Sequence, residues 1–94
     1  MNRNEEFSKL FPLDFTDYEI YDTVRSSIEN YYYHKLDPGS FVYAMLCNDF
    51  IGAVLRADSW NRLQMYQNAL WLANRMPTSA WGSKEVVDEW LNNK

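Results

Sequence analysis

Apolar side chains recur at helical spacing along this 94-residue chain, and no stretch alternates with a period of two. This pattern predicts an all-α protein. We expect one small domain of about four helices, because a chain of this length has room for a single hydrophobic core. The helical domain is expected over residues 16–94 and an apolar N-terminal arm over residues 1–15, where Pro12 breaks any helix begun before it.

Two capping signals define the first two expected helices. Thr16-Asp17-Tyr18-Glu19 matches a capping box and predicts a helix over about residues 17–33. Asp37-Pro38-Gly39-Ser40 predicts the start of a second helix over about residues 39–57. The aspartate caps this helix ahead of the proline, or the four residues form a turn and the serine is the cap.

Two further helices are expected in the C-terminal half. Asp58 or Ser59 caps a third helix over about residues 60–75, and Ser83 caps a short last one. The predicted core faces are Val42, Met45, Leu46, Phe50 and Val54 on the second helix and Leu63, Tyr66, Leu70 and Ala73 on the third.

The net charge of −4 disfavours direct binding to DNA or RNA, because an acidic protein gains nothing from releasing counterions. An acidic stretch, Asp14 to Asp22, either faces a basic partner or forms a solvated first helical turn. Cys47 is the single cysteine, which excludes an intramolecular disulfide and a cysteine-based metal site. Neither a signal peptide nor a membrane span is apparent, so we expect a soluble cytoplasmic protein with no membrane partner.

Aromatic residues make up 17% of the chain, more than so small a domain can bury. Tyr31, Tyr32 and Tyr33 are consecutive and point about 100° apart on a helix, so at least one is exposed or contacts another chain. The third helix also carries apolar residues on more than one face. We therefore expect a homo-oligomer, although exposed rings without a partner remain the alternative. The predicted interface residues are Tyr31, Tyr33, Tyr66 and Trp71.

Motifs of known enzyme classes are missing from the sequence. His34 is the only imidazole, and it lies near the end of the first helix, where the helix dipole favours a cation. We predict no catalytic residues, no metal ligands and no cofactor.

The apolar run from Leu46 to Trp60 contains unexpected polar residues. On one continuous helix, Asn48, Asp49 and Arg56 share a strip with only glycine and alanine between them. In a structural interpretation, Asp49 bonds Arg56, Arg62 or a neighbouring helix end and fixes helix order.

In a functional interpretation of the same strip, arginines bind an anion while an aromatic ring stacks on a planar group, as in nucleotide binding. The candidate ligand-binding residues are Asn48, Asp49, Arg56, Trp60 and Arg62. We rank the structural interpretation first, because an ion pair needs no ligand.

A series of short motifs extends over roughly residues 28–91: Tyr33-His34-Lys35, Pro38-Gly39-Ser40-Phe41, Leu46-Cys47-Asn48-Asp49-Phe50, Arg56-Ala57-Asp58, Asn61, Pro77, Trp81-Gly82-Ser83 and Trp90. In this pattern the sequence resembles a family of small bacteriophage-encoded proteins. Relatives often have His-Gly where this chain has His34-Lys35. The resemblance implies phage origin and an accessory role in the host cytoplasm, and it supplies no catalytic residue.

Small accessory proteins without catalytic motifs usually act by stoichiometric binding. Our first hypothesis is an oligomeric counter-defence protein that sequesters a small nucleotide-type immune signal between its subunits. The alternative is an inhibitor that binds a host defence or regulatory protein through the acidic stretch at residues 14–22 and exposed Tyr or Trp side chains.

Overall fold

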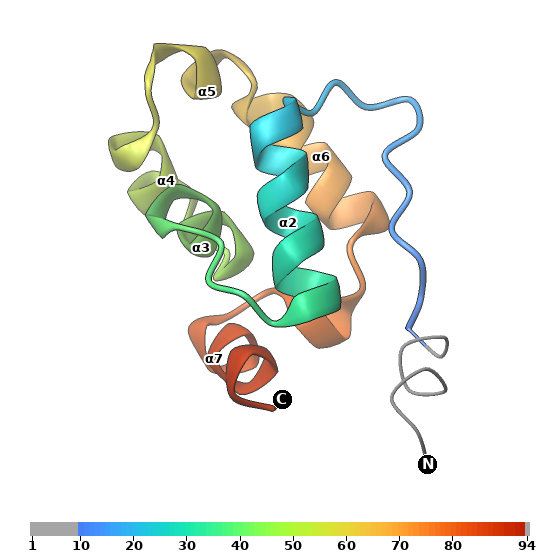
Figure 1. Cartoon of the computed structure of the whole chain (residues 1–94). Coiled ribbons are helices and arrows are strands. Elements are labelled where there is room, and N and C mark those ends of the chain that lie inside the picture. Colours follow the sequence, from blue (N-terminus) through green and yellow to red (C-terminus); the bar gives the residue numbers. More distant parts are fainter. Residues whose placement is uncertain (1–9, 94) are drawn as a thin grey trace.

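The computed structural model describes residues 10–93, and every regular element in this range is a helix. The elements are α2 (Asp22–His34), α3 (Ser40–Leu46), α4 (Phe50–Arg56), α5 (Ser59–Leu63), α6 (Met65–Arg75), the 3-10 helix η1 (Thr78–Ala80) and α7 (Lys84–Asn92). The all-α prediction is confirmed, and a radius of gyration of 13.0 Å is that of one compact domain of this length. Figure 1 shows α2 in the middle of the molecule, with α3 and α4 on one side and α7 closing one end.

Helix α2 begins at Asp22, later than the capping box at residues 16–19 predicted. Thr16 N donates instead to Asp14 Oδ1 at 2.9 Å, and Asp17 adopts a left-handed φ of 74°. This local turn competes successfully with the helix, because short polar side chains offer the backbone an alternative bond. The capping-box prediction is therefore wrong.

The second expected helix is divided into α3 and α4. Asn48 adopts φ 63° between them, a left-handed conformation that asparagine tolerates better than most residues and that no helix can contain. At its start, α3 follows Gly39 at φ 86°, and Asp37 Oδ1 accepts a hydrogen bond from Gly39 N. Neither expected cap applies, since Asp37 forms a turn and Ser40 is already helical.

The third expected helix is likewise divided, at Gln64, into α5 and α6. Capping by Asp58 and by Ser83 is confirmed: each side chain accepts a hydrogen bond from the backbone N–H three residues on. The structure thus has six α-helices in residues 10–93 rather than about four, because short breaks separate segments that share one apolar pattern.

The core is centred on large aromatic side chains of α2 and α6. Tyr31 and Trp71 are both 0% exposed, so predicting them at an interface with another chain was wrong. Tyr31 OH donates to Ala80 O at 2.7 Å, and Trp71 Nε1 donates to Asp14 O at 2.8 Å. In the core of the domain both rings bury their apolar surface, while their O–H and N–H groups form hydrogen bonds with backbone carbonyls.

The predicted N-terminal arm extends over residues 1–15, of which residues 1–9 lie outside the described range. Its described part runs against the core without regular structure. Phe15 stacks on Trp71 with ring centroids 4.3 Å apart, and Tyr32 OH donates to Phe11 O. Tyr33 OH accepts a hydrogen bond from Leu13 N. Residues 10–15 therefore dock on their own domain.

Candidate functional site

The polar residues at the start of α4 cap that helix. Asp49 is its N-cap, and Asp49 Oδ1 accepts a hydrogen bond from Gly52 N at 2.9 Å. Asn48, one residue earlier, is exposed and supplies the left-handed turn that separates α4 from α3. The break in the apolar run therefore marks a helix boundary, which the helical pattern on either side had concealed.

Asp49 and Arg56 meet over Gly52. A Cβ on this glycine would lie against Asp49 Oδ2, 2.8 Å from Asp49 Cγ and 3.0 Å from an Arg56 guanidinium nitrogen. That arginine also donates to Gly52 O at 3.0 Å. The expected strip with small residues beneath it is present, because α4 alone is long enough to bring the two side chains together.

The predicted buried ion pair is not formed. Asp49 and Arg56 are both exposed, and neither Arg56 nor Arg62 forms an ion pair with a carboxylate of the described residues. Arg62 Nε donates to Val54 O at 3.4 Å, which ties α5 to the end of α4. One part of the structural interpretation is therefore kept: Asp49 binds a helix end. That end is the N-terminus of its own helix, α4, and not of a neighbouring one.

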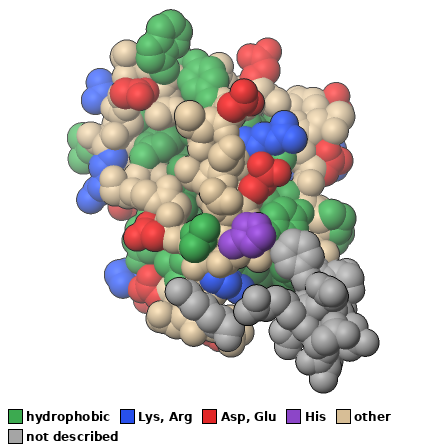
Figure 2. All heavy atoms as spheres, viewed as in Figure 1, with side chains coloured by type: hydrophobic (Ala, Val, Ile, Leu, Met, Phe, Trp, Pro, Cys, Tyr) green, Lys and Arg blue, Asp and Glu red, His purple; other side chains and the backbone are tan. Residues whose placement is uncertain are grey.

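The outer surface of α4 and α5 is apolar. Six of the eight large hydrophobic side chains exposed in the described residues fall within residues 51–66, and we call this surface the α4–α5 face. Its members are Ile51 (79% exposed), Val54 (41%), Leu55 (74%), Trp60 (68%), Leu63 (76%) and Tyr66 (72%). Along the edge of the molecule formed by α4 and α5, Figures 1 and 2 show hydrophobic side chains with basic and acidic ones between them.

Three residues of the α4–α5 face were wrongly predicted to be buried in the core. Val54, Leu63 and Tyr66 were predicted on core faces, whereas the core faces of these helices are formed by Ala53 on α4 and by Trp71 and Leu72 on α6. The helix breaks rotate each short segment relative to its neighbour, so one apolar pattern no longer marks one face. Small residues were the available signal, since Gly52, Ala53 and Ala57 mark the buried side of α4.

Four of the five predicted ligand-binding residues lie along or beside the α4–α5 face. Trp60 and Arg62 lie on α5, while Asp49 and Arg56 lie at the two ends of α4. Of the predicted interface residues, Tyr66 is exposed on this face, whereas Tyr33 is half-buried and packs edge-on against Tyr32.

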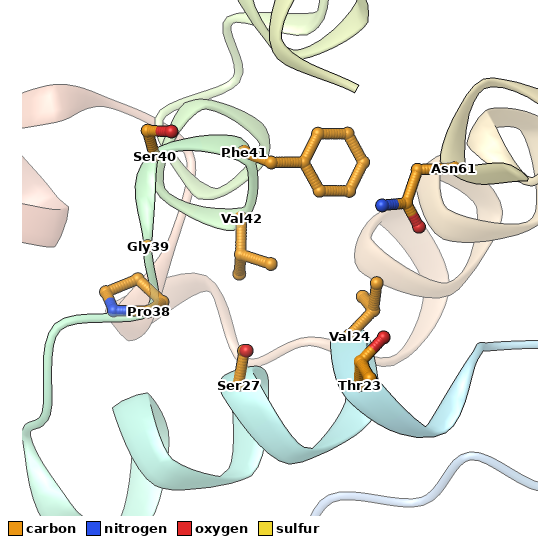
Figure 3. A pocket seen from close by; sticks show the side chains of 9 residues that line it. All are labelled: Thr23, Val24, Ser27, Pro38, Gly39, Ser40, Phe41, Val42 and Asn61. Atoms are coloured by element: carbon orange, nitrogen blue, oxygen red, sulfur yellow. The ribbon is translucent and has the colours of Figure 1, made fainter. Parts of the chain in front are cut away.

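A solvent-open groove of about 250 Å³ lies between α2, α3 and α5 (Figure 3). Phe41 and Asn61 point toward each other from opposite sides, and the rest of the lining mixes hydroxyl and apolar side chains of α2 and α3. The groove contains none of the five predicted ligand-binding residues. Its lining consists of Thr23, Val24, Ser27, Pro38, Gly39, Ser40, Phe41, Val42 and Asn61.

A separate polar cluster joins α7 to α3. Asp88 accepts hydrogen bonds from Lys84 Nζ and from Tyr43 OH, both at 2.6 Å. The bonds from Lys84 and Tyr43 hold the pKa of Asp88 below its usual range. Burial raises the pKa of the neighbouring Cys47 thiol, which favours its less reactive protonated form.

Comparison of the chain with known protein families, with curated proteins and with solved structures gives no match. Residues 10–93 contain no group of three or more His, Cys, Asp or Glu side chains placed to hold a metal ion. None of the helices in this range is long and apolar enough to cross a membrane.

Proposed function

We propose that this protein is a non-catalytic binding protein that contacts a protein partner through the α4–α5 face. The observation that carries the proposal is the exposure of six large apolar side chains within sixteen residues. Applied to the sizes of these side chains, their exposed fractions sum to roughly 800 Å², the order of area that each partner buries in a standard protein interface.

The shape of the α4–α5 face favours a protein over a small ligand. Five of its six apolar residues lie on the short helices α4 and α5 and Tyr66 on the first turn of α6, and Trp60 and Leu63 are more than two-thirds exposed. A small ligand needs a concave site that buries most of its surface, whereas a protein can cover a convex one. Trp60 and Tyr66 are also of the residue types that dominate binding energy at protein interfaces.

A pull-down tests the proposal. Tagged protein is mixed with a bacterial lysate that also contains the untagged chain, and the stoichiometric partners are identified. We expect Leu55→Asp combined with Leu63→Asp to lose the partner, because two charges would be buried in the contact. The control is Leu36→Asp, which alters a half-exposed leucine outside the face. Partners unaffected by the double substitution would contradict the proposal.

The same pull-down examines the acidic stretch. Charge reversal of Asp17 and Asp22 removes a partner only if that stretch, rather than the α4–α5 face, is the contact surface. Both carboxylates are exposed and lie outside the face, Asp17 ahead of α2 and Asp22 as its first residue.

Sequestration of a nucleotide-type signal is the second candidate. It is favoured by two guanidinium groups, those of Arg56 and Arg62, that have no carboxylate partner in the described residues, and by the exposed Trp60 ring between them in the sequence. Calorimetry against cyclic nucleotides and ADP-ribose derivatives tests this candidate. Binding that is lost in Arg56→Gln and Arg62→Gln would support it, and no heat at tens of micromolar would refute it. In either case, we propose an accessory role in a phage-infected bacterium.

A further inference from the structure

We propose that the α4–α5 face binds a second copy of this chain, with the two α4 helices antiparallel across a two-fold axis. This inference rests on the proposed function because it uses the same face, and it names the partner. It is carried by the order of the charges on the face, by the symmetry that this order permits and by the exposed apolar area.

The charges on the face are balanced in a protein that is otherwise acidic. Between residues 49 and 66 there are two carboxylates and two guanidinium groups, whereas the whole chain carries a net charge of −4. In sequence order they are Asp49, Arg56, Asp58 and Arg62, so each of the two helices has an acid at its start and a base at its end. A strongly basic or acidic partner would leave two of these four groups facing a like charge. A second copy, turned end for end, faces each group with its opposite.

The positions of the charges on α4 fit a two-fold axis perpendicular to that helix. Ile51 and Leu55, one turn apart, form the exposed apolar stripe, and Asp49 and Arg56 lie together along one edge of it. Such an axis brings the same edge of both helices together in reverse order. Ile51 then faces the partner's Leu55, and Asp49 faces the partner's Arg56. Antiparallel packing also opposes the two helix dipoles favourably.

The charged groups keep capacity for contacts across this axis. Only Oδ1 of Asp49 is bonded to Gly52 N, and Arg56 uses one guanidinium nitrogen on Gly52 O. The remaining carboxylate oxygen and N–H groups have no bond within the described residues. A guanidinium and a carboxylate from each copy would form a four-charge cluster with alternating signs.

Paired charge reversals test the dimer. In Asp49→Lys the cluster would hold four positive groups, and in Arg56→Glu four negative ones, so each variant alone should dimerise roughly tenfold more weakly than the wild-type chain or worse. An equimolar mixture restores two groups of each sign, and we expect a heterodimer by native mass spectrometry. Circular dichroism checks that both variants fold, since Asp49→Lys removes a helix cap. Variants that dimerise like the wild-type chain, or a folded pair that fails to form the heterodimer, would overturn the inference.

An apolar variant gives a second test that leaves the caps intact. Leu55→Asp should make the protein monomeric in light scattering at concentrations where the wild-type chain and the control Leu36→Asp are dimers. A dimer that persists in Leu55→Asp overturns the inference, as does a wild-type chain that is monomeric at several hundred micromolar. A monomeric wild-type chain that still captures a foreign protein through the face overturns the dimer alone and leaves the proposed function standing.

Discussion

Two polar side chains, those of Asp49 and Arg56, lie over Gly52 because that residue has no Cβ. Asp49 caps the first turn of α4 from this position, and Arg56 bonds the glycine carbonyl. Glycine is normally unfavourable inside a helix by about 0.5–1 kcal/mol relative to alanine. Here the cost is offset by a cap worth about 1 kcal/mol that a methyl group would displace.

Gly52→Ala should therefore fail to stabilise the protein, although alanine is the better helix former. In an Asp49→Ala background the cap is already lost, so the same change should add about 0.5–1 kcal/mol to the free energy of unfolding. A double-mutant cycle by urea denaturation measures the difference. Equal effects of Gly52→Ala in both backgrounds would show that the two residues are not coupled.

At the scale of the element, helix type was predictable and helix ends were not. Ser83 was predicted as a cap and Asp58 as one of two candidate caps, and both form their hydrogen bonds, whereas the capping box at residues 16–19 lost to a turn anchored by Asp14. The break at Asn48 was missed because the flanking residues of α3 and α4 keep the spacing of one helix. An asparagine followed by aspartate inside an apolar run is the local signal, since the pair supplies both a left-handed turn and a cap.

The left-handed φ of Asn48 predicts how the α3–α4 connection responds to substitution. Asn48→Ala should lower the free energy of unfolding by about 1 kcal/mol, because a Cβ without a polar group is strained in this conformation. Asn48→Gly should be tolerated, with a change of roughly 0.5 kcal/mol or less, since glycine adopts this conformation freely. Chemical denaturation of both variants measures the order, and alanine being as stable as glycine would contradict it.

The attachment of α7 to α3 should depend on pH through Asp88. Its pKa is lowered in the folded protein, chiefly by the hydrogen bond from Lys84 and then by that from Tyr43. The folded state thus binds a proton less readily than the unfolded chain, so the stabilisation is present above the ordinary carboxyl pKa of 3.8 and is lost as pH falls through the lower folded value. The melting temperature of the wild-type chain should exceed that of Asp88→Asn at neutral pH. The gap should close as the pH falls below the lowered pKa of Asp88, and a gap independent of pH would contradict this origin.

For the whole molecule, composition and periodicity were sufficient to predict one all-α domain, because they report how much apolar surface must be buried. They could not locate the exposed part of that surface. Tyr31 and Trp71 were expected at an interface and are the centre of the core, while Ile51 and Leu55 form the outer surface of α4. Which rings are buried depends on how short helices pack together, and residue spacing within one segment contains no such information.

The central claim is that the α4–α5 face is covered in solution, and Trp60 reports on this directly. It is 68% exposed, whereas Trp71 is fully buried and the other two tryptophans are half-buried. Acrylamide quenching is measured as the difference between the wild-type chain and Trp60→Phe over a range of protein concentrations. We predict that quenching of Trp60 falls as the concentration rises and that Leu55→Asp abolishes this fall. Quenching of Trp60 that is equally efficient at every concentration would contradict the claim.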